Sequence, residues 1–354
     1  MKRSLCIFTT LGLVATACGP RVPAATTDAP VRTVVAAEAY GSAIDSVRSL
    51  LRPIAERGAG IALAVHRGRS ALWVEGLGNA DEAGRRPVDP ELTLFRVYSL
   101  TKAMTAAAGA RLMETGRLDP AAPVQRYLPS FPVKNRPVTA MGLANHEAGI
   151  RHYRAGEARS LVPCATVLDA LPIFADDPLV PLDPGAEAYS SWGYVLLSAV
   201  LEVAAGEPFP ELMDHLVLDP AAMSRTRLDA PETPADLATP LVETVAGVVP
   251  EEAVDNRCKW GAGAYLATAP DLARFGVALF DGTLLGPQAA ALFLQGGDVY
   301  RAQGVGAGGT AFMLSHAPSG TSLVLLGNVS GQTIGPALQS AFEVMVDLFL
   351  TPPP

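Results

Sequence analysis

Ser99 and Lys102 form the feature of this sequence with the clearest chemical content. They stand three residues apart in the motif SLTK, at the start of a segment whose apolar spacing predicts a helix over residues 99–115. Three residues of a helix turn through about 300°, so both side chains lie on one face, one turn apart. A serine hydroxyl becomes a nucleophile when a base takes its proton, and an amine is such a base once burial or a nearby cation lowers its pKa. The pair therefore indicates acyl transfer, with the Ser99 N–H at the helix start as an oxyanion donor. Alone, the motif also fits a helix-capping serine beside a solvated lysine.

Short motifs accompany this pair in a set order. They are FRVY at residues 95–98, GRLDP at 116–120, LANHEAGI at 143–150, PGAEAYSSWGY at 184–194, KWGAG at 259–263 and ATAPDL at 267–272. Together with SLTK, over roughly residues 40–350, they resemble the serine beta-lactamase and penicillin-binding superfamily, in its class C-like esterase and peptidase branch. The segments GIRHY at 149–153 and DNRCKW at 255–260 look most similar to the mitochondrial serine beta-lactamase-like group and its bacterial relatives.

The resemblance implies a role for each matching residue. Ser99 is then the acylated nucleophile, and Lys102 shares its proton. Tyr189 would complete proton transfer to the leaving group and activate the deacylating water, provided that adjacent cations pull its pKa well below about 10. Ser191 stands where many relatives carry asparagine. It could bond Lys102 or a substrate amide, or equally serve as the N-cap of a helix predicted over residues 191–205.

A glycine-rich segment late in the chain departs from the family pattern. Relatives carry a triplet headed by lysine or histidine and ending in glycine, on the strand that lines the cleft. The best match here is Gly306-Ala307-Gly308, which makes the N–H of Gly309 the second oxyanion donor. A register two residues earlier, over 304–306, makes Ala307 the donor instead. In both registers the cationic head is missing.

Loss of that cation predicts poor beta-lactam hydrolysis and weak recognition of a terminal D-alanine carboxylate. We expect a small-molecule ester or an internal peptide bond as substrate, with no cofactor and no metal. One alternative is a catalytically weak or inactive scaffold or binding lipoprotein on the same fold, with the self-association known in the mitochondrial group. Another is a carboxypeptidase in which Lys259 or Arg301 supplies the carboxylate anchor.

The hydrophobic pattern predicts an α+β fold. Helices are expected at 41–57, 99–115, 191–205 and 334–350, and strands at 60–66, 71–78, 264–268, 311–315 and 323–327. The resemblance implies the beta-lactamase-like fold over residues 36–350. It consists of an antiparallel sheet from 58–80 and 260–350, flanked by helices, with a mostly helical lobe over about 97–255 inserted.

The N-terminal segment has the pattern of an export signal. A basic start and an apolar stretch end in Ala15-Thr16-Ala17, which predicts a signal peptide over residues 1–17. Cys18 follows at once, as in bacterial lipoproteins, so the chain is either lipidated at Cys18 or secreted free after Ala17. Residues 18–35 then form a tether rich in proline, alanine and threonine. We expect a periplasmic or cell-envelope protein, anchored in the membrane if Cys18 carries lipid.

Composition excludes several other classes of protein. The net charge is −8, hydrophobic residues make up 49% and charged residues 18%, which excludes a disordered chain and argues against nucleic acid as a partner. The sequence contains neither a CxxC nor an HExxH motif, so these patterns give no indication of a metal site. An oxidising compartment permits a bridge between Cys164 and Cys258, and two separate buried thiols fit the sequence equally well.

Overall fold

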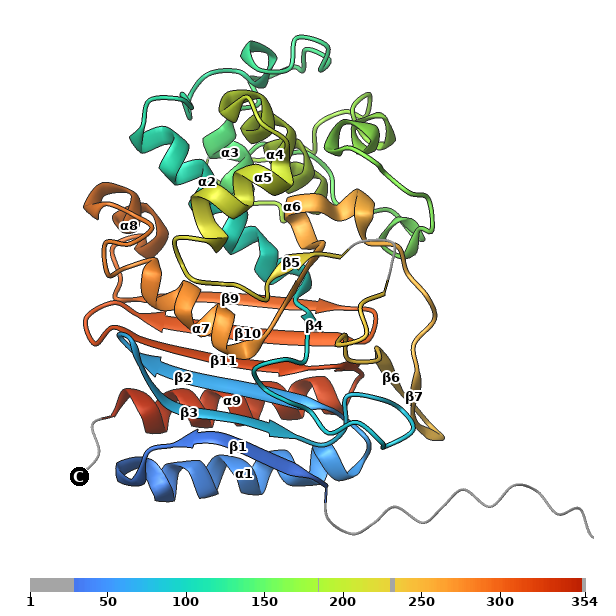
Figure 1. Cartoon of the computed structure of the whole chain (residues 1–354). Coiled ribbons are helices and arrows are strands. Elements are labelled where there is room, and N and C mark those ends of the chain that lie inside the picture. The colour runs from blue at the N-terminus through green and yellow to red at the C-terminus, as the bar shows by residue number, and fades with distance from the viewer. Residues whose placement is uncertain (1–28, 184, 230–232, 352–354) are drawn as a thin grey trace, which may run out of the picture.

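The computed structural model describes residues 29–183, 185–229 and 233–351. The predicted signal peptide over 1–17 and the lipidation site Cys18 lie outside the described residues. The described chain has two parts: a large sheet with helices on both faces, and a mostly helical lobe beyond one edge of that sheet (Figure 1). This confirms the predicted α+β class, an antiparallel sheet flanked by helices with a mostly helical lobe.

The large sheet has six strands in the order β1-β3-β2-β11-β10-β9, and every neighbouring pair is antiparallel. The strands are β1 Val31–Ala36, β2 Ile61–Arg67, β3 Ser70–Leu77, β9 Val299–Gly306, β10 Gly309–His316 and β11 Thr321–Gly327. Both ends of the chain therefore contribute to one sheet. The edge strand β9 faces the helical lobe (Figure 1).

Alternating side chains of the central strands serve two separate cores. In β2, Ile61, Leu63 and Val65 pack with α1 (Gly41–Glu56) and α9 (Ile334–Leu350) on one face. The alanines between them, Ala62 and Ala64, point to the other face, where α7 (Ala269–Ala278) packs. Small residues on that face let α7 lie close to the sheet, because successive strand side chains point to opposite faces.

The lobe is built from short helices around two longer ones. These elements are α2 Thr101–Glu114, α3 Ala140–Ala144, α4 Ser191–Ala205, α5 Phe209–Met213, α6 Trp260–Gly263 and α8 Pro287–Leu294, with shorter turns η2 Tyr98–Leu100, η3 Val124–Arg126, η4 Glu157–Arg159, η5 Val167–Ile173, η6 Asp214–Leu218 and η7 Arg257–Lys259. Another turn, η1 (Glu38–Tyr40), precedes α1. The helices α2 and α4 pack against each other and against α6, which places the start of each near the sheet edge.

Two small sheets connect the parts. One joins β4 (Phe95–Arg96), β8 (Tyr265–Ala267) and β5 (Arg227–Leu228), and the other joins β12 (Val329–Ser330), β6 (Leu241–Thr244) and β7 (Gly247–Pro250). The strand predicted at 264–268 exists as β8, but it pairs with β4 and not with the large sheet.

Most predicted elements are confirmed, but the bounds of the tether and of the lobe are wrong. The lobe, expected over about 97–255, also contains α6 and α8, which follow residue 255. The helices expected at 191–205 and 334–350 begin and end at those residues. Residues 31–35, placed in the tether over 18–35, instead belong to β1, which pairs with β3. This edge strand is mostly exposed, and Arg32 and Thr33 interrupt its apolar residues, which hides it from a search for apolar runs.

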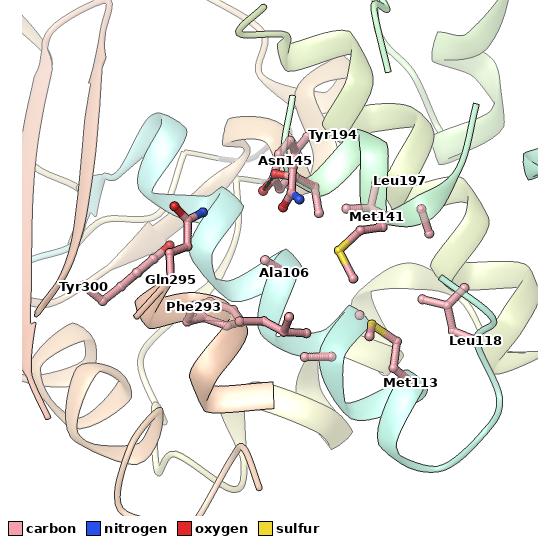
Figure 2. Close-up of a pocket in the computed structure, with 15 residues that line it drawn as sticks. Ala106, Met113, Leu118, Met141, Asn145, Tyr194, Leu197, Phe293, Gln295 and Tyr300 are labelled. Atoms are coloured by element: carbon pink, nitrogen blue, oxygen red, sulfur yellow. Dashed lines mark hydrogen bonds between the residues drawn. The ribbon is translucent and has the colours of Figure 1, made fainter. Parts of the chain in front are cut away.

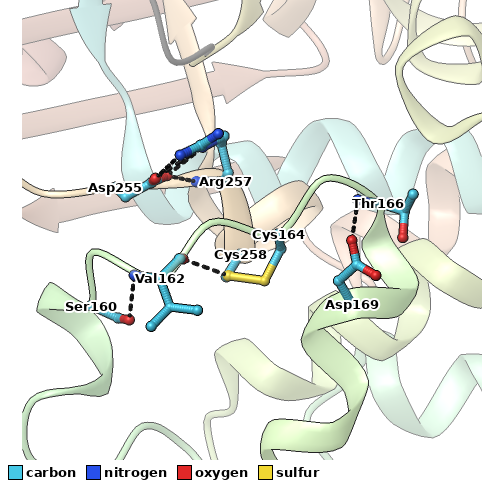
Figure 3. The surroundings of a disulfide bond; sticks show 8 residues. All are labelled: Ser160, Val162, Cys164, Thr166, Asp169, Asp255, Arg257 and Cys258. Carbon is cyan, nitrogen blue, oxygen red and sulfur yellow. Dashed lines mark hydrogen bonds and ion pairs between the residues drawn. A yellow bond between two sulfur atoms is a disulfide. The ribbon is translucent and has the colours of Figure 1, made fainter.

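Cys164 and Cys258 form a disulfide, with their Cα atoms 4.9 Å apart, which resolves the alternative left open by the sequence. The bond joins the loop before η5 to η7, across 94 residues of chain, and the Val162 carbonyl lies beside Cys258 (Figure 3). It therefore fixes the segment that leads into α6.

Among the described residues, none of the helices combines the length and the apolar content needed to cross a bilayer.

Candidate active site

Ser99 lies in the η2 turn immediately before α2, one turn ahead of the place where regular helix begins. Its predecessor Tyr98 has φ +43°, a left-handed conformation that is costly for a residue with a large side chain. This kink carries the chain from β4 into α2 and leaves the Ser99 N–H in the first turn, where helical N–H groups have no acceptor within the helix.

Lys102 points from the first turn of α2 to three oxygen atoms. Its Nζ donates to Ser99 Oγ at 3.0 Å, to Ser191 Oγ at 3.1 Å and to the Ala262 carbonyl at 2.7 Å. The residue is only 6% exposed. Burial, with a smaller effect of the Lys259 charge, lowers the pKa of Lys102 to about 7. An amine with this pKa is largely neutral above neutral pH and can accept the serine proton.

Tyr189 reaches the same serine from the segment before α4. Its hydroxyl donates to Ser99 Oγ at 2.5 Å, and Lys102 Nζ lies 4.8 Å from the ring centre. Although the residue is 48% exposed, partial burial raises the pKa of the Tyr189 hydroxyl above its ordinary value, an effect that the hydrogen bond to Ser99 only partly opposes. The condition that adjacent cations pull this pKa well below about 10 is therefore not met, since the nearest amine, Lys102, is itself easily deprotonated. Tyr189 keeps its proton near neutral pH.

Two histidines hold the start of α4 in place. The Nδ1 atom of His146 accepts the Ser190 N–H at 3.2 Å, and Nδ1 of His152 accepts the Ser191 N–H at 3.1 Å. Burial and the Lys102 charge lower the pKa of His146 to about 4 and also lower that of His152, so both rings are neutral acceptors. Their ring centres lie 4.6 Å and 5.3 Å from that of Tyr189. In the sequence, His152 stands within the segment GIRHY, but the resemblance of that segment assigned it no catalytic or binding role.

Ser190, not Ser191, caps α4. The Ser190 hydroxyl accepts the Gly193 N–H at 2.8 Å, whereas the Ser191 hydroxyl accepts from Lys102. Of the two roles considered for Ser191, the structure therefore shows the bond to the lysine.

The glycine-rich segment forms the tip of the β9–β10 hairpin, against the ring of Tyr98. A Cβ on Gly306 would lie 2.4 Å from that ring, and a Cβ on Gly309 would lie 2.7 Å from it. The Tyr98 hydroxyl donates to the Ala307 carbonyl at 2.5 Å. Glycine is needed at these two positions because the Tyr98 ring fills the space that a side chain would occupy.

The register of the β9–β10 hairpin also shows which backbone N–H group is not used in pairing between these two strands. Gly306 faces Gly309 across the turn Ala307-Gly308, and the closing pair of such a turn exchanges backbone hydrogen bonds. The next pair, Val305 and Thr310, does not, so the Val305 N–H points to the outer side of the edge strand. Gly308 donates its N–H to Ser330 Oγ, and neither Gly308 nor Gly309 lines the cleft. The placement of the second donor at Gly309 is therefore not supported, whereas Ala307, the alternative, stands in the turn and does line the cleft.

The serine opens into a cleft of about 890 Å³ between the lobe and the sheet edge. Two of the three predicted catalytic residues, Ser99 and Tyr189, line it, and so does Ser191, which binds the third, Lys102. Its walls also include His152, Lys259, Gln303, Val305, Gly306, Ala307 and Ser330. Arg301, considered as a carboxylate anchor, instead pairs with Glu343 at 2.8 Å and does not line the cleft. Within the described parts of the chain, no group of three or more His, Cys, Asp and Glu residues could hold a metal ion.

A second, apolar pocket lies on the other side of α2. Ala106 and Met113 of α2, Met141 of α3 and Phe293 of α8 line it, and Figure 2 shows Tyr194 in its wall. The Tyr194 ring centre is 5.6 Å from Lys102 Nζ, so this aromatic ring separates the pocket from the buried amine.

Comparison with known proteins is consistent with this geometry. The family model described as Beta-lactamase matches residues 47–345. Serine beta-lactamase-like protein LACTB, mitochondrial, of Mus musculus is 30% identical over 338 residues, which cover 71% of this chain and 60% of that protein. Esterase EstB of Burkholderia gladioli is 32% identical over 179 residues, 46% of this chain and 45% of its own. The crystal structure of D-amino acid amidase from Ochrobactrum anthropi SV3, complexed with L-phenylalanine amide, shares the fold with a TM-score of 0.74 at 20% identity, covering 88% of this chain and 99% of that one.

Proposed function

Because the chain belongs to the beta-lactamase family, we propose that it is a serine hydrolase that works through an acyl-enzyme on Ser99. The observation that carries this proposal is one shared contact: Ser99 Oγ lies 3.0 Å from Lys102 Nζ and 2.5 Å from the Tyr189 hydroxyl. The chain spans only 60% of the length of the LACTB protein compared above, so its activity is inferred from its own site.

Acylation begins with the neutral form of Lys102. As Ser99 Oγ attacks the substrate carbonyl carbon, its proton passes to Lys102 Nζ, and the carbonyl electron pair moves onto oxygen. When the tetrahedral intermediate collapses, the bond to the leaving group breaks. Tyr189 gives its proton to the leaving oxygen or nitrogen and regains one from Lys102, so no net proton is lost. The protonated state of Tyr189 makes it the acid of this step, not the base.

Two backbone N–H groups are positioned to hold the negative oxygen. One belongs to Ser99, in the first turn before α2, and the other to Val305, on the outer side of β9. The strand approaches the turn closely at Gly304, where a Cβ would lie 1.9 Å from the Val97 carbonyl oxygen. Fixed donors of this kind stabilise an oxyanion without reorganisation. In deacylation, water attacks the acyl carbon and gives a proton to Lys102. The departing Ser99 oxygen then takes a proton from Tyr189, which regains one from Lys102.

A small ester or amide fits this site best. Both bonds present a carbonyl carbon to Ser99 and a leaving group to Tyr189, and the compared relatives are named an esterase and a D-amino acid amidase. The hairpin tip carries glycine where relatives of the class C-like branch carry lysine or histidine, so we expect slow turnover of beta-lactams.

Labelling with a fluorophosphonate tests the nucleophile. We expect a stoichiometric label on the wild type and on Ser49→Ala, a change in an exposed serine of α1, and no label on Ser99→Ala. The wild type and Ser49→Ala should hydrolyse p-nitrophenyl butyrate, and Ser99→Ala should not. Equal labelling of all three proteins would refute the assignment. Folded protein without label or turnover would favour the inactive scaffold.

We also propose that the chain is exported and anchored through Cys18, as the N-terminal pattern predicts. The disulfide between Cys164 and Cys258 supports an oxidising compartment. Expression in a bacterium with labelled palmitate should label the wild type and not Cys18→Ser, which should leave the membrane fraction. Self-association stays a prediction, for which sedimentation of the purified protein is the test.

A further inference from the structure

Lys259 is a buried cation in the cleft wall without a carboxylate within ion-pair distance among the residues that the structure describes. It ends η7, lines the same cleft as Ser99 and is only 8% exposed. Its ammonium donates to Asn256 Oδ1, a neutral amide, at 2.7 Å, and lies 5.5 Å from the centre of the Tyr98 ring. Burying an ammonium group is costly unless an anion compensates it, so this position invites a negative ligand.

The hydrogen-bond network behind Lys259 carries an excess of positive charge. Arg96 donates to Asp229 Oδ2 at 2.9 Å, and Asn256 donates to the same oxygen at 2.8 Å. Arg96 and Asp229 therefore neutralise each other, and Asn256 only relays the contact to Lys259. Two cations share one carboxylate, which leaves one uncompensated positive charge at the cleft end of the network.

Other charged groups nearby are already paired. Arg159 and Glu251, which also line the cleft, form an ion pair at 2.7 Å, and Asp255 is bound by Arg257 at 2.9 Å. Hydrogen bonds from Thr333 and Ile334 at the start of α9, with a smaller effect of the bound Arg57, lower the pKa of Glu243 to about 2. Lys102 is needed in its neutral form. Lys259 is therefore the group in this set best placed to attract an anion, although burial and the Arg96 charge lower its pKa to about 8.

The local backbone places Lys259 close to the reacting groups. It precedes α6, whose Ala262 carbonyl accepts from Lys102 at 2.7 Å, and residues three apart on a helical turn are neighbours. The disulfide at Cys258 fixes the preceding residue (Figure 3). The lysine thus stands on a rigid segment that also holds the buried base.

We propose that Lys259 is a specificity-determining residue that binds a carboxylate group of the substrate, so that the enzyme prefers esters or amides bearing a negative charge near the scissile carbonyl. This inference rests on the proposed function. In this proposal, Lys259 of η7 does the carboxylate binding for which relatives use the lysine or histidine of the glycine-rich triplet. The expectation of weak carboxylate recognition, drawn from Gly306 alone, would then be reversed by a residue from η7.

Paired boronic acids test this assignment. Boron accepts an electron pair from Ser99 Oγ, the serine proton passes to the base, and the resulting tetrahedral adduct inhibits hydrolysis of p-nitrophenyl butyrate. We compare 3-carboxyphenylboronic acid with its neutral methyl ester. For the wild type, we expect the inhibition constant to favour the carboxylate by about 10- to 100-fold, the range for a hydrogen bond between charged groups.

Matched variants separate the anchor from other effects of charge. Lys259→Met should bring the ratio of the two inhibition constants near one, and Lys259→Arg should keep part of the preference. Lys134→Met, which removes a cation outside the cleft that binds backbone carbonyls and not a carboxylate, should behave as the wild type. Using the ratio cancels any change in the Lys102 pKa, since both boronic acids need the same base.

The outcomes distinguish failure of the serine hydrolase proposal from failure of the Lys259 anchor. If neither boronic acid inhibits and no ester is hydrolysed, the proposed serine hydrolase fails. If both inhibit the wild type equally, or if Lys259→Met keeps the full preference, the hydrolase stands and the carboxylate anchor is overturned. The wild-type ratio alone decides the question if Lys259→Met does not fold.

Discussion

Replacing Lys102 by methionine should change stability in a pH-dependent way. In the folded protein, burial lowers the pKa of this amine from 10.5 to about 7, so it is neutral when an unfolded lysine is still charged. Between these two values the unfolded state binds one proton more than the folded state. The free energy of unfolding therefore rises as pH rises through this window, and it lacks this contribution below pH 7.

The size of the effect follows from the same two values. Integrated from pH 6 to pH 9, the difference in bound protons stabilises the wild type by roughly 2–3 kcal/mol, a contribution that methionine lacks. Lys102→Met should accordingly be more stable relative to the wild type at pH 6 than at pH 9. The loss of three hydrogen bonds of Lys102 Nζ adds a constant that does not alter this difference.

Urea unfolding at pH 6 and pH 9 and constant ionic strength measures this difference. Lys134→Met, changed outside the cleft, provides the background for losing a lysine. In the wild type, kcat/KM for a neutral ester should rise with pH through about 7, since the deprotonated amine is the base. If wild type and Lys102→Met differ in unfolding free energy by the same amount at both pH values, the amine is charged throughout, and its assignment as the base is refuted.

Three further changes have expected outcomes. Tyr189→Phe should lower kcat by about 100-fold or more for an alkyl ester, and less for a p-nitrophenyl ester, whose leaving group needs no proton; equal losses in steady-state assays would contradict the acid role. Gly306→Ala places a Cβ 2.4 Å from the Tyr98 ring and should lower stability by about 1–3 kcal/mol together with activity, whereas Gly335→Ala, with open space around its Cβ, should not; thermal unfolding of both variants measures this, and a neutral Gly306→Ala would show that the ring can move. Cys258→Ser removes a bridge across 94 residues and should cost about 2–5 kcal/mol in urea unfolding; an unchanged midpoint would mean that the bond does not form in solution.

The convergence of Ser99, Lys102 and Tyr189 could be anticipated because each stands in a short motif whose spacing and order are visible in the chain. The helices that begin next to them, α2 and α4, have apolar spacing and clear stop residues, so their ends were also predictable. Gly206, for example, ends α4 in the left-handed conformation expected of a terminating glycine.

The parts that escaped prediction depend on contacts between distant segments. The edge strand β9 alternates exposed and half-buried residues and ends in glycines, so it lacks the apolar run that marks a strand. The roles of Val305 and Gly309 follow from hairpin register, which a shift of one residue inverts. His152 and Lys259 gain their surroundings only when the lobe folds onto the sheet edge, and the partner of Cys258 lies 94 residues away.

Tyr98 ties the nucleophile to the opposite wall of the cleft. Its backbone leads directly into Ser99, while its hydroxyl binds the Ala307 carbonyl at the hairpin tip, 209 residues later in the chain. The Tyr98 side chain therefore links the segment of one proposed oxyanion donor, Ser99, to the hairpin that carries the other, Val305. This link restrains the distance between the two donors. A bulky acyl group that pushes the hairpin outward would also tilt the serine, so poor steric fit is converted into poor alignment for attack. Selection by shape thus acts on the chemical step itself as well as on binding.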